Sequence, residues 1–237
     1  MKQPTILFVL LFGLLVGQDK PIPSSKKDRE PIRFSKEFRG NFHGKSTSYK
    51  ASHYETILYE KDDYEKPMAS IFVTEYSSIK KDPSRPVVFI FNGGPGSASL
   101  WLHMGVMGPK VVKVPSDAKD DGSPPYKLVD NPLSPLDIAD LVCIDPVGTG
   151  YSLAMGEHEN KEFWGVKQDA KNVSQFVRQW IQENNRWNSP KYILGESYGG
   201  IRGPQMLAEL RNGQLTNMEI NGLILVSPAT DLQHIRF

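Results

Sequence analysis

The chain has 237 residues, of which 39% are hydrophobic, and its formal net charge at pH 7 is +1. Such a length and composition are typical of one large globular domain with a substantial core. Basic and acidic residues are interspersed along the chain, so no basic face indicates a nucleic acid or an anionic membrane as a partner.

The first 17 residues have the pattern of a secretory signal peptide. Lys2 precedes an apolar run from Ile6 to Val16, which ends at Gly17. The run is shorter than the roughly 20 residues of a membrane-spanning helix, although an uncleaved N-terminal anchor is the alternative interpretation. We therefore expect an exported protein, in an extracellular, periplasmic, vacuolar or lysosomal compartment, with no membrane attachment after residues 1–17 are removed.

Residues 18–40 are rich in Pro, Lys, Ser and Arg, and this composition predicts a mobile leader. The folded domain is then expected over residues 41–237. Its first elements are two segments in which aromatic and β-branched residues alternate with others, 46–59 and 68–76. They predict an antiparallel pair of strands at the edge of a sheet.

Two continuous apolar runs, residues 86–91 and 140–144, predict strands that are covered by helices on both faces. The second run contains Cys143, the only cysteine, which is expected to be buried and cannot form an intramolecular disulfide. Between the two runs, residues 110–114 and 126–129 predict short strands around a loop rich in Pro, Asp and Gly.

A strong helical pattern follows the strand expected over residues 140–144. Its apolar residues recur in steps of three and four on one face: Phe163, Val166, Ala170, Val173, Val177 and Trp180. An apolar strand that ends at Gly195, another helix, and a strand over residues 222–226 continue the alternation. This order predicts an α/β fold with a mainly parallel central sheet and flanking helices.

The segment Lys191–Gly200 reads Lys-Tyr-Ile-Leu-Gly-Glu-Ser-Tyr-Gly-Gly, a strand, a sharp turn and the start of a helix. It contains the pattern G-x-S-x-G, in which small residues flank a serine held at a strained backbone angle. Ser197 is therefore the candidate nucleophile, pointing outward at a helix N-terminus. Unpaired backbone N–H groups and the positive end of the helix dipole favour negative charge there.

A nucleophilic serine also needs hydrogen-bond donors for the oxyanion of its tetrahedral intermediate. In this kind of turn one donor is the N–H of the residue after the nucleophile, here Tyr198, and the other comes from the loop after an earlier central strand. Asn92-Gly-Gly-Pro-Gly96 is that loop, because it directly follows the apolar run at 86–91. We assign the second donor to the Gly94 N–H.

Three ordered motifs make this sequence resemble the serine carboxypeptidases: Asn92-Gly-Gly-Pro-Gly96, Asp145-Pro-Val-Gly-Thr-Gly-Tyr-Ser152 and Gly195-Glu-Ser-Tyr-Gly-Gly200, with Pro204 seven residues after the serine. The resemblance covers about residues 38–231. It implies an α/β-hydrolase fold, a peptide as the substrate, and removal of C-terminal residues through an acyl-enzyme on Ser197. It also implies that Asn92 and Glu196 bind the substrate carboxylate, and it implies no cofactor or metal.

Two features depart from the family pattern. The family usually has a second glutamate shortly before a Gly-Pro pair in the loop after the first motif, and this chain has Val106 there. Two close carboxyl groups share a proton, which favours acid conditions. With Glu196 alone, we expect weaker selection for a free C-terminus and a less acidic pH optimum. In addition, Ser97 stands where a cysteine is usual, consistent with the missing disulfides.

The larger departure concerns the rest of the catalytic triad. In α/β-hydrolases the acid and then the histidine follow the serine, but only Asp231 and His234 are available here, and they come too early in the fold to fill these roles. The other histidines precede the serine and have no metal-binding spacing. We therefore expect the chain to correspond to the N-terminal half of an enzyme that is C-terminally incomplete.

Three functions remain open from the sequence. The first is a serine carboxypeptidase, with little or no hydrolysis by the 237-residue form and an exposed sheet edge that promotes aggregation. The second is an esterase or acyltransferase with the same nucleophile. The third is a non-catalytic binding module that has kept the cleft.

Overall fold

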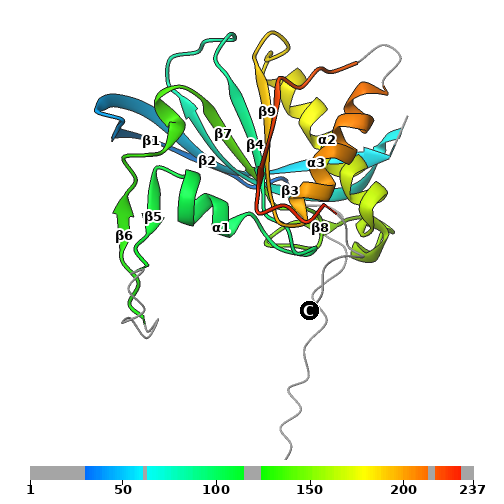
Figure 1. The fold of residues 1–237 in the computed structure, drawn as a ribbon. Helices are drawn as coiled ribbons and strands as arrows, with labels where there is room; N and C mark the ends of the chain where they lie inside the picture. The colour runs from blue at the N-terminus through cyan, green and yellow to red at the C-terminus, as the bar shows by residue number, and fades with distance from the viewer. Residues whose placement is uncertain (1–29, 61–62, 115–123, 213–216, 231–237) are drawn as a thin grey trace, which may run out of the picture.

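The computed structural model describes residues 30–60, 63–114, 124–212 and 217–230. An eight-stranded sheet runs through it in the spatial order β1-β2-β3-β7-β4-β9-β10, with β8 paired to β3 (Figure 1). Its strands are β1 (Arg33–Phe42), β2 (Lys45–Glu60), β3 (Asp63–Ser78), β4 (Val87–Phe91), β7 (Asp140–Ile144), β8 (Leu153–Ala154), β9 (Lys191–Glu196) and β10 (Gly222–Val226).

The sheet is mixed. Strands β7, β4, β9 and β10 are parallel to one another, whereas β1, β2, β3 and β8 form antiparallel pairs and β3 also pairs antiparallel with β7. The antiparallel pair expected over residues 46–59 and 68–76 is confirmed as β2 and β3, although both strands are longer than predicted and β1 continues the sheet beyond β2. The predicted α/β class is confirmed, and the parallel half supplies the strands whose carboxyl ends meet at one edge.

Two layers of apolar side chains cover the sheet, one on each face. Along β4, Val87, Phe89 and Phe91 belong to the cluster under the large helices, and Val88 and Ile90 belong to the opposite cluster. This division follows from the strand period of two. All five residues are buried, as expected for a strand covered on both sides. Cys143 is also buried, as predicted.

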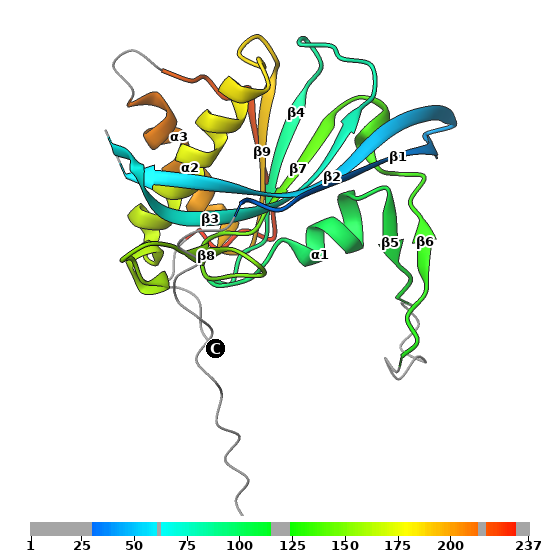
Figure 2. The same ribbon diagram turned by 180° about the vertical axis from the view of Figure 1, so that it is seen from behind.

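The helices divide between the two faces. Helices α2 (Val166–Glu183) and α3 (Gly199–Arg211) pack against each other on one face, and α1 (Leu100–Leu102), which continues as the π-helical turn η1 (His103–Met107), lies on the other (Figures 1 and 2). The predicted helix is confirmed as α2, but Phe163 lies before it, in the 3-10 turn η3 (Asn160–Phe163). Gly165, at a φ of 95°, separates the two.

The expectation of a mobile leader over residues 18–40 is wrong for its last part. Residues 33–40 belong to β1, which pairs along its whole length with β2, from Arg33 opposite Tyr54 to Phe42 opposite Lys45. Most of its side chains are exposed, so the strand forms through backbone hydrogen bonds rather than burial. Residues 18–29 and the expected signal peptide, 1–17, lie outside the described residues.

A small second sheet lies beside α1. Strand β5 (Lys110–Val112) pairs with β6 (Leu128–Asp130) in antiparallel register, which confirms the two short strands expected there. The hairpin projects from the body of the molecule (Figure 2). The remaining short element, the 3-10 turn η2 (Pro135–Asp137), leads into β7.

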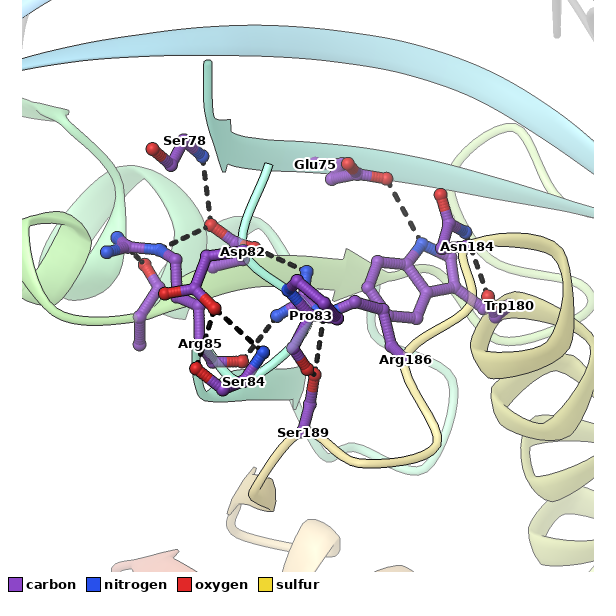
Figure 3. A network of polar contacts seen from close by, with 12 residues as sticks. Glu75, Ser78, Asp82, Pro83, Ser84, Arg85, Trp180, Asn184, Arg186 and Ser189 are labelled. Atoms are coloured by element: carbon purple, nitrogen blue, oxygen red, sulfur yellow. Dashed lines mark hydrogen bonds and ion pairs between the residues drawn. The ribbon is translucent and has the colours of Figure 1, made fainter. Parts of the chain in front are cut away.

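A buried polar network ties the amino ends of the parallel strands together (Figure 3). The Asp140 carboxylate accepts hydrogen bonds from Arg85 Nε at 2.8 Å, from Arg186 Nη1 at 2.6 Å and from the Ser78 N–H at 2.9 Å. Arg186 Nε also donates to Ser189 Oγ at 2.6 Å, just before β9. The buried charge of Asp140 is tolerated because each oxygen of its carboxylate accepts a hydrogen bond. The network lies at the opposite end of β9 from Ser197.

The outer strand of the parallel half, β10, is only partly covered. It pairs with β9 along one edge, and Ile224, Leu225 and Val226 remain more than a third exposed. In a parallel sheet such side chains are normally buried on both faces. Among the described residues, no helix is long and apolar enough to cross a membrane.

Candidate active site

Ser197 occupies a sharp turn between β9 and α3. Its φ is 55°, a left-handed conformation that costs a non-glycine residue about 1–3 kcal/mol and is held only by its surroundings. Small neighbours make the turn possible: a Cβ on Gly195 would lie 2.7 Å from the Gly199 carbonyl oxygen and 2.8 Å from the Phe91 ring. The strand, turn and helix predicted around this serine are confirmed.

Backbone hydrogen bonds from β10 and the residues after it hold the strained serine in place. The Ser197 N–H donates to the Val226 carbonyl oxygen at 3.0 Å, and the Ser197 carbonyl oxygen accepts from the Ala229 N–H at 2.8 Å. The same oxygen accepts from the Gly200 N–H in the first turn of α3, also at 2.8 Å. Both sides of the residue are therefore anchored to neighbouring segments of the fold.

The loop Asn92–Gly96 lies directly against this turn. A Cβ on Gly93 would meet the Tyr198 backbone nitrogen at 2.4 Å, the Glu196 carbonyl oxygen at 2.6 Å and Ser197 Cβ at 2.8 Å. Real Cβ atoms never approach backbone so closely, so only glycine fits there. The structure thus brings together the loop and the serine that the sequence predicted to form one site.

The two expected oxyanion donors lie in the two segments that meet at this contact. Gly94 follows the close contact at a φ of 106°, and Tyr198 is the residue before the first turn of α3. Within the described ranges, neither the Gly94 N–H nor the Tyr198 N–H donates a hydrogen bond to another residue. Unpaired N–H groups at a helix N-terminus can stabilise an oxyanion.

Asn92 and Glu196 are hydrogen-bonded to each other. Asn92 Nδ2 donates to Glu196 Oε2 at 3.1 Å, and the Gly93 N–H donates to the same oxygen at 3.3 Å. Asn92 Oδ1 accepts from the Leu102 N–H at 3.0 Å, which joins the pair to α1. Asn92 is fully buried and Glu196 partly exposed, so Glu196 is the member of the pair that solvent reaches.

A buried ion pair lies behind the site. Arg202, from α3, is only 1% exposed, and its Nε donates to Asp169 Oδ2 of α2 at 2.7 Å. Arg202 Nη1 donates to the Asn92 carbonyl oxygen at 2.8 Å. The guanidinium group also lies over the rings of Phe91 and Tyr198, at 4.9 and 5.2 Å from the centroids. Burial raises the pKa of the Asp169 carboxyl, although Arg202 and Tyr198 lower it.

The second motif, residues 145–152, forms a turn at the carboxyl end of β7. Asp145 Oδ1 accepts a hydrogen bond from the Ser99 N–H at 2.8 Å, but burial outweighs this bond and raises the pKa of the carboxyl to about 6. Gly150, at a φ of 54°, leaves room for the other carboxylate oxygen. Ser152 Oγ donates to the Asp145 carbonyl oxygen at 2.6 Å and accepts from the Phe72 N–H at 2.7 Å, which links the turn to β3.

The described histidines are all engaged away from Ser197. His103 contacts the Tyr76 hydroxyl at 2.6 Å, and burial lowers the pKa of its ring to about 4, so it is neutral. The others are bonded to side chains elsewhere: His43 to Asp137, His53 to Thr74, and His158 to Glu162 and Glu60. Asp231 and His234 lie outside the described residues. In the part of the chain that the structure describes, no cluster of His, Cys, Asp or Glu could hold a metal ion.

Sequence reasoning missed Arg202, Asp169 and the burial of Asp145. A signal for Arg202 exists: the arginine interrupts the run Gly-Gly-Ile-Arg-Gly-Pro, in which every other residue is small or apolar. A charged side chain in an otherwise apolar first turn of a helix, just after the serine, requires a buried partner. The partner itself has no local signal, since Asp169 lies 33 residues earlier.

The mixed sheet, the strained serine at the end of β9 and the adjoining glycine loop define an α/β-hydrolase. Comparison with known proteins narrows the class, since the model of the serine carboxypeptidase family matches residues 53–235. The chain belongs to the serine carboxypeptidase family.

Relatives agree with this assignment. The chain is similar to serine carboxypeptidase-like 16 of Arabidopsis thaliana, at 30% identity over 179 residues, covering 72% of this chain and 38% of the relative. Serine carboxypeptidase-like 2 of the same plant is 28% identical over 173 residues, which are 70% of this chain and 38% of the relative. The chain therefore spans well under half the length of these proteins.

A solved structure shares the fold. Kex1(delta)p, a prohormone-processing carboxypeptidase from Saccharomyces cerevisiae, superposes with a TM-score of 0.54 at 20% identity, over 77% of this chain and 39% of that one. At this identity the likeness supports the α/β-hydrolase architecture.

Proposed function

We propose that this chain carries the nucleophile of a serine-type carboxypeptidase. Ser197 Oγ attacks the carbonyl carbon of the last peptide bond, and the C-terminal residue leaves as the amine. Water then hydrolyses the acyl-enzyme. The observation that supports this most is the close approach of Gly93 to the turn of the strained Ser197, because Gly94 and Tyr198, whose N–H groups have no partner among the described residues, adjoin that contact.

The preference for a peptide end is assigned to Asn92 and Glu196. Their hydrogen-bonded pair faces solvent through Glu196, beside the proposed oxyanion donors. Val106, 56% exposed on η1, supplies no second carboxyl, so we propose modest selection for a free C-terminus and activity that persists above mildly acid pH.

The absence of a second carboxyl at Val106 supports a second candidate function, the hydrolysis of esters or acyl transfer. With weak selection for the carboxylate, the nucleophile would also accept substrates that lack one. Comparing turnover of a blocked dipeptide, its C-terminal amide and the corresponding ester separates the two functions. A carboxypeptidase prefers the free acid by about 10-fold or more, whereas an esterase prefers the ester and does not distinguish acid from amide.

None of the described histidines is available as the general base, since each is bonded elsewhere. We therefore propose that the 237-residue form alone turns over peptides slowly or not at all.

We also propose that the protein is exported, which the apolar run after Lys2 supports. N-terminal sequencing of the secreted product tests it: a protein that begins at Met1 would contradict cleavage after Gly17.

A fluorophosphonate probe tests the nucleophile directly. The native protein is treated with the probe, and the modified peptide is identified by mass spectrometry, alongside Ser197→Ala and Ser84→Ala. Ser84 lies in an exposed turn before β4, at the opposite end of that strand from the loop that begins at Asn92, and serves as the control. Labelling that Ser197→Ala abolishes and Ser84→Ala preserves supports the proposal. A fully folded native protein that is not labelled would favour a binding module.

A further inference from the structure

Arg202 has a position unlike that of any ordinary helix arginine. It lies on α3 five residues after Ser197, is 1% exposed, and has a counter-charge in Asp169, itself 9% exposed. Arginine presents its donors in a rigid planar fork, so two bonds made by one guanidinium fix the relative positions of their acceptors. Here the acceptors belong to α2 and to the loop after β4.

The peptide group between Asn92 and Gly93 is held from both sides. Its carbonyl oxygen accepts from Arg202 Nη1 at 2.8 Å, and its N–H donates to Glu196 Oε2 at 3.3 Å. Arg202 and Glu196 flank Ser197 in the chain, one before it and one after. The next peptide group carries the Gly94 N–H. Fixing one peptide plane restricts the next, since only the two dihedral angles of Gly93 separate them.

We propose that Arg202 is a positioning residue that sets the Gly94 N–H against the Ser197 turn. The proposal rests on the proposed function for its catalytic meaning, but the geometry that it describes is testable without catalysis. The guanidinium holds the Asn92–Gly93 peptide group on one side, opposite Glu196. The guanidinium itself is held by Asp169 and by the rings of Phe91 and Tyr198. The oxyanion site is thereby assembled on three elements, β4, α2 and α3.

The competing explanation is that the ion pair stabilises the packing of α2 on α3 and does nothing for the loop. Two substitutions separate these roles. Arg202→Lys keeps a positive charge beside Asp169 but cannot reach Asp169 and the Asn92 carbonyl with one fork. Asp169→Asn removes the charge partner but leaves the Arg202 bond to Asn92 in place. A purely structural role predicts that Asp169→Asn is the more harmful change for every property.

Amide hydrogen exchange, read by mass spectrometry on the full chain, reports on the loop. We expect Arg202→Lys to raise exchange in the peptide containing Gly93 by about tenfold, the effect of losing one hydrogen bond that holds it. We expect Asp169→Asn to leave that exchange within about twofold while lowering the thermal midpoint more than Arg202→Lys does. Arg178→Lys is the matched control, because Arg178 Nη2 also joins α2 to backbone carbonyls of α3, at Glu209 and Leu210.

The outcomes decide the proposal. Unchanged exchange at Gly93 in Arg202→Lys, or equal loosening in Asp169→Asn, overturns it, as does an Arg202→Lys chain that fails to fold, since Arg202 would then serve core stability. If the native protein hydrolyses peptides, Arg202→Lys should lower kcat by about 10²-fold with little change in KM, as for loss of one oxyanion donor. A native protein without activity would refute the proposed function, while the hydrogen-exchange result would still test whether Arg202 positions the loop.

Discussion

Replacing Asp145 by Asn should make the protein more stable at neutral pH. The carboxyl is largely buried at the end of β7, and among the described residues one N–H, that of Ser99, donates to it at 2.8 Å. Burial raises the pKa of this carboxyl from 3.8 to about 6, so the folded protein binds its proton more tightly than the unfolded chain. Asparagine keeps an oxygen for the Ser99 N–H and carries no charge.

The sign and size follow from proton linkage. Between about pH 4 and 6 the folded state holds the proton and the unfolded state has lost it, so this group's contribution to stability falls as pH rises. Each pKa unit corresponds to about 1.4 kcal/mol, so a pKa difference of about two lowers the free energy of unfolding by about 3 kcal/mol at pH 7. Asp145→Asn does not titrate, so it should match the parent near pH 4 and exceed it by up to about 3 kcal/mol above pH 6.

The assay is urea unfolding of parent and variant at half-unit steps from pH 4 to pH 8, followed by circular dichroism. Subtracting the two free energies of unfolding at each pH cancels every other titrating group that both proteins share. The difference should grow with pH and level off above pH 6. A constant difference across the range would refute the reasoning, since it would mean that the Asp145 carboxyl titrates alike in the folded and unfolded chains.

Three further predictions follow from contacts described above. Gly93→Ala should lower fluorophosphonate labelling of Ser197 by at least about 10²-fold, because the new Cβ pushes the loop from the turn, whereas Gly105→Ala, which meets open space, should label normally. Glu196→Gln should lower the preference for a free acid over an amide substrate to about unity while ester turnover persists; an unchanged preference would remove Glu196 from the carboxylate site. His158→Gln should cost stability below about pH 6.5 and progressively less as pH rises, because neighbouring carboxylates raise the pKa of His158; a loss that is the same at pH 5 and pH 9 would contradict this.

The parallel half of the sheet and the Ser197 turn were predictable because their signals are local. A strand buried on both faces is apolar throughout, as residues 86–91 are, and a strained turn demands glycine at fixed offsets. The contact between the loop and the turn was predictable too, since parallel strands bring their carboxyl ends to one edge. The family resemblance named the same residues independently.

The elements that sequence reasoning missed depend on distant partners or on backbone alone. Strand β1 has polar, exposed side chains, so its composition resembles a leader, and only pairing with β2 makes it a strand. Arg202 meets the Asn92 carbonyl from 110 residues away, and no short pattern encodes that bond. Asp145 likewise meets a distant segment, since its carboxylate accepts from the N–H of Ser99, the residue just before α1.

The anchoring of Ser197 by Val226 has a consequence for synthesis on the ribosome. The acceptor of the Ser197 N–H lies 29 residues further along the chain (226 − 197), so it has not yet been added when the serine is incorporated. At about 5–20 residues per second, those residues take about 1.5 to 6 seconds to add. Until then the left-handed backbone of Ser197 lacks one of its anchors, and the nascent chain should carry an unactivated serine. We therefore expect the nucleophile to mature only when β10 has joined the sheet, after the strands before it have already formed.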